Sequence, residues 1–167
     1  SPRRSALAAA PGLGSGVSPP GKTRPPIIAG GGSLSDAARD RAVRLRNAIA
    51  KLNQNAPSGS DYTYVLVDCP PSLNLLTVNA MAASDAILVP LQCEFFALEG
   101  LSQLLQTVEQ VRSTLNPNLS IHGIVLTMFD SRNNLSNQVV ADVRQFMGGK
   151  VYDTMIPRNV RISEAPS

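Results

Sequence analysis

From about residue 36 onward, short apolar runs alternate with longer segments in which apolar residues recur every three or four positions. The runs at 64–67, 86–91, 121–128 and 151–156 predict strands, and the segments at 36–52, 72–83, 98–115 and 134–147 predict helices. The run 64–67 has no polar break, which is typical of a strand buried on both faces. Strands alternating with helices favour an α/β fold with a parallel sheet of about four strands flanked by helices.

The first 35 residues follow a different pattern. They are rich in Pro, Gly, Ser and Ala and show no sustained periodicity. Such a segment buries too little apolar surface to offset its chain entropy. We therefore expect a disordered tail over 1–35 and a folded part over 36–167. Since the chain starts with Ser and stops without an ending signal, we also expect a fragment.

Composition narrows the class of protein. The 167 residues are 43% hydrophobic, 16% charged and 4% aromatic, which suits one α/β domain. No apolar run approaches the roughly 20 residues that span a bilayer. The net charge of +3 permits contact with nucleic acid without requiring it. The two cysteines, Cys69 and Cys93, are too few for a disulfide framework and flank apolar strands, which favours buried free thiols in a reducing cytosol.

Asp68 ends the first apolar run and is followed by Pro70 and Pro71. The prolines prevent the strand from continuing, so Asp68 lies at the carboxyl end of its strand. Open α/β sheets bind ligands at that end, and a carboxylate there can hold Mg²⁺ or its water beside a nucleotide phosphate. The alternative is that Asp68 caps the following helix, and the pattern alone leaves both interpretations open.

Polar residues follow each of the other predicted strands as well. In a parallel sheet these strand ends share one edge, so we expect the clusters to converge on a ligand site. The clusters, in chain order, are Asp68 and Ser72; Gln92 and Glu94; Asp130, Arg132 and Asn134; and Arg158, Asn159 and Arg161.

The tail contains the string G-x-x-x-x-G-K-[ST], formed by Gly16, Gly21, Lys22 and Thr23. A phosphate loop needs a strand before it and a helix after it, so that successive N–H groups surround the phosphates. The pattern predicts no strand before Gly16, and Pro19 and Pro20 remove two N–H groups. We therefore interpret the string as a chance match to the Walker A pattern.

The residues Asp68-Cys69-Pro70-Pro71-Ser72-Leu73 resemble the Walker B region of the ParA/Soj family of chromosome- and plasmid-partitioning ATPases. The resemblance covers about 36–167 and is specific. It continues through Pro90–Gly100, Leu126–Ser136 and Ile156–Ser167.

This resemblance implies a P-loop NTPase fold of the deviant Walker A type. Members bind ATP and Mg²⁺, form homodimers around the nucleotides and bind DNA nonspecifically. A ParB-type partner stimulates hydrolysis, and the cycle segregates chromosomes or plasmids. The implied location is the cytoplasm, at the nucleoid, with no role at a membrane; a MinD-like membrane-site regulator is a weaker alternative.

The resemblance also assigns roles by position. Asp68 corresponds to the Walker B carboxylate that acts on Mg²⁺ through water. Pro157, Arg158 and Asn159 correspond to the segment that lines the adenine pocket. Arg132 and Arg161 correspond to DNA-binding positions, and guanidinium groups suit contacts to phosphates. The alternative for each arginine is a solvated surface charge.

Three features of the family are missing from the sequence pattern. These are the opening strand, the loop K-G-G-x-G-K-[ST] and the second acidic residue that positions the attacking water. We therefore expect only part of the P-loop fold, no complete catalytic set, weak ATP binding and negligible hydrolysis. Without the opening strand, the strands at 64–67 and 86–91 must pair directly or leave a gap, which would make the sheet marginally stable.

Two hypotheses about function remain open at this point. In the first, the chain is a fragment of a partitioning ATPase whose complete form performs the cycle above. In the second, it is a noncatalytic remnant that keeps DNA- or partner-binding surfaces. An ATP-binding assay in the presence of Mg²⁺ discriminates between them.

Overall fold

The structure is a computed structural model that describes residues 5–9, 40–54, 64–70, 72–159 and 161. The named elements in chain order are β1 (Ser5–Ala9), α2 (Arg44–Gln54), β2 (Tyr64–Asp68), α3 (Leu75–Ala83), β3 (Ala86–Gln92), α4 (Ala97–Thr114), β4 (Ser120–Thr127), α5 (Asn134–Met147) and the 3₁₀ turn η1 (Gly148–Lys150).

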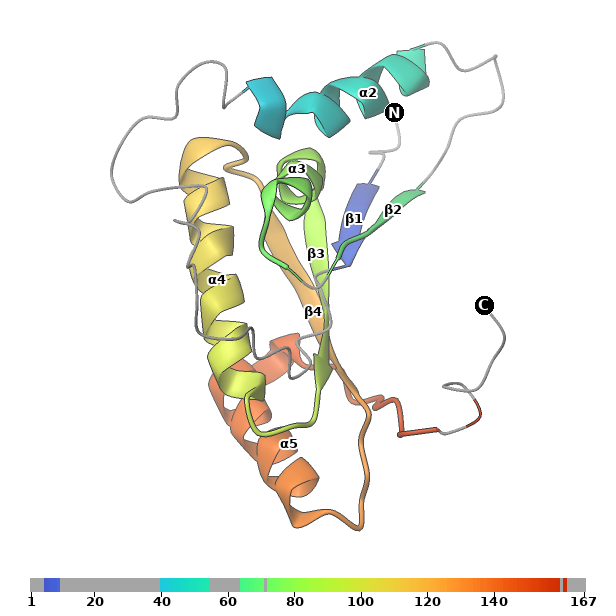
Figure 1. Cartoon of the computed structure of the whole chain (residues 1–167), viewed down its shortest axis with the longest axis vertical. Helices are drawn as coiled ribbons and strands as arrows, with labels where there is room; N and C mark the ends of the chain where they lie inside the picture. Colours follow the sequence, from blue (N-terminus) through green and yellow to red (C-terminus); the bar gives the residue numbers. More distant parts are fainter. Residues whose placement is uncertain (1–4, 10–39, 55–63, 71, 160, 162–167) are drawn as a thin grey trace, which may run out of the picture.

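The strands form one parallel sheet in the order β2-β1-β3-β4. The helices α4 and α5 run along one side of this sheet, and α2 and α3 lie at one end of the molecule (Figure 1). The predicted α/β class and parallel sheet are confirmed.

The position of β1 corrects two expectations from the sequence. Residues 5–9 were placed in a disordered tail, yet they form a strand between β2 and β3. Leu7 is in register with Leu66 on one side and with Ala86 on the other. The predicted direct pairing or gap between β2 and β3 is therefore wrong. Two facing strand edges carry unpaired backbone groups, and a short extended segment satisfies both without a specific side-chain pattern. The rest of the predicted tail, 10–35, lies outside the described residues.

The predicted strand at 151–156 is the other departure. The segment touches the edge of β4 only through isolated bridges, Ile124 to Val151 and Phe129 to Pro157. Its backbone N–H groups at Tyr152 and Ile156 donate to Ile124 and Leu126 at 2.9 and 2.8 Å. The apolar pattern identified the contact with β4, but a continuous ladder does not form.

The helix boundaries follow from capping. The amide oxygen of Asn74 accepts hydrogen bonds from the N–H groups of Leu76 and Thr77, so α3 begins later than predicted, at Leu75. Asn133 caps α5 in the same way through Leu135 N. The same helix ends at Gly148, whose φ of 54° lies in the left-handed region that glycine adopts easily.

The hydrophobic core lies between the sheet and the helices on one of its sides. The inward-facing residues of β3 and β4 are fully buried against α3 and α4. The members of this core include Ile87, Val89, Leu91, Ile124 and Leu126 from the strands and Leu101, Leu104 and Val108 from α4.

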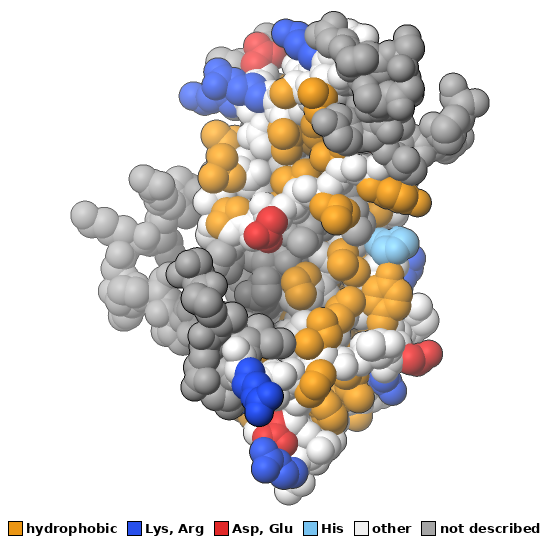
Figure 2. All heavy atoms as spheres, turned by 90° about the vertical axis from the view of Figure 1, so that its right-hand side faces the viewer, with side chains coloured by type: hydrophobic (Ala, Val, Ile, Leu, Met, Phe, Trp, Pro, Cys, Tyr) orange, Lys and Arg blue, Asp and Glu red, His pale blue; other side chains and the backbone are white. Residues whose placement is uncertain are grey.

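The prediction that β2 is buried on both faces is wrong. β2 is an edge strand with alternating exposure, and Tyr64 and Leu66 are 69% and 74% exposed. Val67 packs with Cys69 and Ala80, so Leu66 points to the opposite side. Figure 2 faces the side of the molecule away from α4 and α5 and shows hydrophobic side chains gathered over it.

Candidate functional site

The loop after β4 and the segment 156–158 enclose a hollow of about 410 Å³ at the carboxyl edge of the sheet. We call it the arginine hollow. Its lining residues among those described are Phe129, Asp130, Ser131, Arg132, Pro157 and Arg158. Residues from two of the four predicted polar clusters therefore meet here, and no described residue of the clusters after β2 and β3 lines the hollow.

Backbone hydrogen bonds hold the two segments together. Phe129 N donates to Ile156 O at 3.1 Å, and Arg158 N donates to Phe129 O at 3.0 Å. Met128, just before this contact, has a φ of 54°, which is uncommon for a residue with a side chain. This conformation turns the chain out of β4 and fixes Arg158 beside the loop that carries Arg132.

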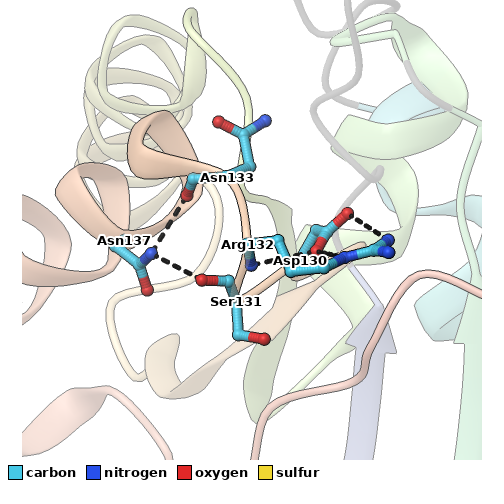
Figure 3. Close-up of polar contacts among 5 residues, drawn as sticks. All are labelled: Asp130, Ser131, Arg132, Asn133 and Asn137. Atoms are coloured by element: carbon cyan, nitrogen blue, oxygen red, sulfur yellow. Dashed lines mark hydrogen bonds and ion pairs between the residues drawn. The ribbon is translucent and has the colours of Figure 1, made fainter.

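The loop from Asp130 to Asn133 is also fixed from α5. Asn137 Nδ2 donates to the carbonyl oxygens of Ser131 and Asn133 at 3.0 and 3.1 Å (Figure 3). Asn133 N donates to Asp130 O at 3.0 Å and closes the turn. Sequence analysis missed both asparagines; an Asn just before a helix is a recognisable capping signal, whereas the clamp by Asn137 has none.

Asp130 and Arg132 form a side-on ion pair within this turn (Figure 3). Arg132 Nε donates to Asp130 Oδ1 and Arg132 Nη2 to Asp130 Oδ2, each at 3.1 Å, and the backbone N–H of Arg132 also donates to Oδ1 at 3.1 Å. These hydrogen bonds lower the pKa of Asp130, with the charge of Arg158 adding to the effect, and the carboxylate in turn raises the pKa of Arg132. Both groups are therefore charged at neutral pH.

The arginine side chains around the hollow are accessible to solvent. The side chain of Arg132 is 89% exposed, and Arg158 and Arg161 are exposed as well. Arg161 N donates to Asn159 Oδ1 at 2.9 Å, which continues the turn beyond Arg158. Among the described residues that line the hollow, two guanidinium groups face one carboxylate, so the hollow favours anions.

Asp68 ends β2 in register with Ala9 and is exposed. It does not cap α3, because Asn74 does. No group of three or more His, Cys, Asp or Glu side chains arranged to hold a metal occurs among the described residues. A lone carboxylate fits Mg²⁺ nevertheless, since that ion keeps several waters and takes its remaining ligands from phosphates. Asp68 is not among the described residues that line the arginine hollow.

The string at Gly16, Gly21, Lys22 and Thr23 lies outside the described residues. One argument against it is wrong nonetheless, because a strand, β1, does precede it. That strand also lies between β2 and β3, next to the strand that carries Asp68. The argument from the two prolines is a property of the sequence and is unaffected.

The prediction of free, buried thiols is confirmed for both cysteines. Burial raises the pKa of the Cys69 thiol, and the neighbouring charge of Asp68 raises it further. Burial also raises the pKa of Cys93. Both thiols are therefore protonated at neutral pH and poor nucleophiles.

Within the part of the chain that the structure describes, no helix has the length and apolar character needed to cross a membrane.

Comparison with known protein families identifies the broad class of protein to which the chain belongs. The sequence model of a family described as AAA domain matches residues 32–121, more than half of the chain. With the parallel sheet and its flanking helices, this makes the chain an α/β protein of the P-loop NTPase type.

The curated relatives define the family more narrowly. The chain is 64% identical over 134 residues to the chromosome partitioning protein ParA of Caulobacter vibrioides, covering 80% of this chain and 48% of that protein. It is 54% identical over 127 residues to the sporulation initiation inhibitor protein Soj of Bacillus subtilis, covering 76% and 48%. The chain belongs to the ParA/Soj family and spans about half the length of these relatives.

Solved structures agree with this fold. A cobyrinic acid a,c-diamide synthase from Mycobacterium smegmatis, with bound ADP and magnesium, is 38% identical with a TM-score of 0.61, over 72% of this chain and 47% of that one. A plasmid partition protein from Borrelia burgdorferi is 21% identical with a TM-score of 0.58, over 77% and 48%, and shows similarity of fold alone.

Proposed function

We propose that this chain is the part of a ParA/Soj-type partitioning ATPase that carries its DNA-binding edge and its Walker B carboxylate. The observation that carries the DNA-binding role is the arginine hollow, where exposed Arg132 and Arg158 lie around one rigid turn. Guanidinium groups held outward on a fixed backbone suit phosphate contacts that are independent of base sequence. Arg161, two residues beyond Asn159, extends the same edge.

The nucleotide role rests on Asp68. Its exposed carboxylate at the end of β2 would hold Mg²⁺ through water, and the ion would neutralise charge on the nucleotide phosphates. Pro157, Arg158 and Asn159 would line the adenine pocket, so that Arg158 is assigned to both the nucleotide site and the DNA-binding edge. The cobyrinic acid a,c-diamide synthase from M. smegmatis, which has also been solved with an ATP analogue and magnesium bound, supports the assignment.

In the complete protein, we infer a homodimer that binds ATP, contacts DNA nonspecifically at the nucleoid and responds to a ParB-type partner. The partitioning names of the relatives support this cycle and its cargo of chromosomes or plasmids. A second function, that of a noncatalytic DNA- or partner-binding remnant, is favoured by the sequence of the Walker A-like string, in which Pro19 and Pro20 remove two N–H groups from the loop.

A DNA-binding titration of the full chain tests the proposal. We expect binding of a 30-base-pair mixed-sequence duplex, measured by fluorescence anisotropy at several salt concentrations. Arg132→Ala and Arg161→Ala should each weaken binding about three- to tenfold and lower the slope of log K against log salt by about one.

Arg112→Ala is the matched control. Arg112 is also a surface arginine in an ion pair, with Glu109 at 2.7 Å, but it lies on α4. Equal losses of DNA affinity for Arg112→Ala and Arg132→Ala would contradict a specific DNA-binding role for the edge that carries Arg132. Repeating the titration with ATP and Mg²⁺ separates the two functions: tighter DNA binding supports the ATPase, and an unchanged affinity supports the remnant.

A further inference from the structure

The Asp130–Arg132 pair has a geometry that leaves one edge of the guanidinium free. A guanidinium is planar and carries five N–H donors in a fixed fork. Asp130 engages the side formed by Nε and Nη2. No described residue accepts a hydrogen bond from Arg132 Nη1, and the side chain is 89% exposed. The outer edge, with Nη1 and the second Nη2 proton, therefore has no acceptor among the described residues and is accessible to solvent.

The carboxylate that orients this guanidinium is itself held in place. Asp130 Oδ1 accepts the backbone N–H of Arg132 as well as its Nε, each at 3.1 Å. The turn around it is closed by Asn133 N on Asp130 O and clamped by Asn137. The side chain of Asp130 is 31% exposed, far less than that of its partner. The pair is thus anchored at the carboxylate and open at the guanidinium.

An ordinary exposed ion pair has no such asymmetry. Two long side chains on a surface contribute little to stability, because holding them together costs rotamer entropy. Here the carboxylate is fixed by its own backbone turn, so the ordering cost falls on Arg132 alone. That cost is met before an anion arrives, which is the condition under which preorganisation raises affinity.

We propose that Asp130 is a positioning residue for anion binding: it holds Arg132 side-on so that the opposite edge of the guanidinium meets a backbone phosphate of nucleic acid. This inference rests on the proposed DNA-binding function and adds the residue that shapes it. Arg158, across the hollow, supplies a second positive charge close to the same carboxylate. Two guanidinium groups and one carboxylate therefore line the hollow among the described residues, which gives it a net positive charge that attracts an anion.

If Asp130 instead competed with phosphate for Arg132, its removal would change the DNA affinity in the opposite direction. A carboxylate that competed with phosphate for Arg132 would have to leave the guanidinium during binding. The exposed guanidinium would then swing away from Asp130, while Asp130 kept its bond to the backbone N–H of Arg132. Removing a competitor would tighten DNA binding, whereas removing a positioning residue weakens it, even though a negative charge is lost.

A double-mutant cycle on the full chain tests this assignment with the 30-base-pair duplex as probe. We expect Asp130→Ala to weaken binding about threefold or more, the range of a single lost charge-assisted contact. In the Arg132→Ala background the same substitution should have no weakening effect. Asp153→Ala removes one exposed carboxylate from the neighbouring segment and should leave affinity unchanged or slightly raised.

A second measurement reports positioning directly. The heteronuclear NOE of the Arg132 Nε–H group, measured by NMR without DNA, should be high in the wild-type chain and low in Asp130→Ala. Asp130→Glu, which moves the carboxylate by one methylene, should lower both the NOE and the DNA affinity. Backbone amide spectra of the remaining residues should be unchanged, which excludes a folding defect.

Different results would contradict the proposed DNA-binding function and the positioning role of Asp130. If Arg132→Ala has no effect on DNA binding, the proposed function is wrong at this edge. If Arg132→Ala weakens binding but Asp130→Ala tightens it or leaves it unchanged, the positioning role is overturned and the proposed function stands. Equal effects of Asp130→Ala in both backgrounds would likewise overturn it, because Asp130 would then act independently of Arg132.

Discussion

At Gly123 in β4, the ring of Tyr152 lies where a side chain would begin. A Cβ atom at this position would be 2.6 Å from Tyr152 Cε2 and 2.9 Å from Cζ. Real Cβ atoms do not approach that closely, so glycine is needed here for close packing and not for a special backbone conformation. Tyr152 is in turn held over β4 by its backbone bond to Ile124 O.

We predict that Gly123→Ala destabilises the chain by about 1–2 kcal/mol, because the tyrosine ring must move off the strand. The loss would appear as a lower urea midpoint for unfolding. In a Tyr152→Ala background the same substitution should cost nothing, since the clash is gone. A full loss in both backgrounds would show that Tyr152 is not the cause.

At the scale of elements, one arginine of α2 hydrogen-bonds to the ends of two other helices, in addition to the packing of Leu45 against the cluster of Cys69 and Ala80. Arg46 Nε donates to Ala82 O at 2.8 Å, Nη2 donates to the same oxygen, and Nη2 also reaches Leu115 O at 3.0 Å. These carbonyls lie at the ends of α3 and α4, where backbone oxygens lack helical partners and the helix dipoles favour a cation. Asn116 satisfies two further carbonyls nearby, those of Met81 and Ser84.

We predict that Arg46→Ala lowers the free energy of unfolding by about 1–3 kcal/mol, the range for charged hydrogen bonds to partly buried groups. Amide hydrogen exchange within α2 should accelerate more than elsewhere, since the helix loses its anchor. Arg44→Ala, on an exposed position of the same helix, is the control and should change stability by less than about 0.5 kcal/mol. Similar effects of both substitutions would argue against an anchoring role.

The hydrophobic pattern of the sequence predicted some of these elements much better than others. Helices α4 and α5 and strands β3 and β4 were predicted almost to the residue, because each has a long apolar repeat and a clear stop signal. β1 could not be predicted from Ser-Ala-Leu-Ala-Ala, since its place depends on the unpaired edges of two strands far along the chain. The meeting of Asp130 with Arg158 follows from the strand-end rule, but the side-on pairing with Arg132 depends on turn geometry that the sequence pattern does not express.

At the scale of the whole molecule, the sheet has one side covered by α4 and α5 and another where hydrophobic side chains gather at the surface (Figures 1 and 2). On the edge strand β2, Leu66 is 74% exposed. An exposed apolar edge strand promotes association with other chains.

We predict that the chain self-associates at micromolar concentration and that Leu66→Lys reduces this association. Stability should change little, because Leu66 buries little surface. Sedimentation velocity over a concentration series measures the effect. Leu52→Lys, which removes another exposed leucine but from α2, should leave the association unchanged. A monomeric wild-type chain would contradict the prediction.

The position of β1 has a consequence for how the fold is completed. Its partners, β2 and β3, come from segments more than fifty residues further along the chain. Pairings of such long range close large loops and are slow to form, so the slot between β2 and β3 is open to competing strands until β1 enters it. Because the slot is filled by backbone hydrogen bonds, an extended segment from another molecule fits it as well. The same feature that completes the sheet thus makes it open to strand exchange between copies, and to reconstitution by a peptide added in trans.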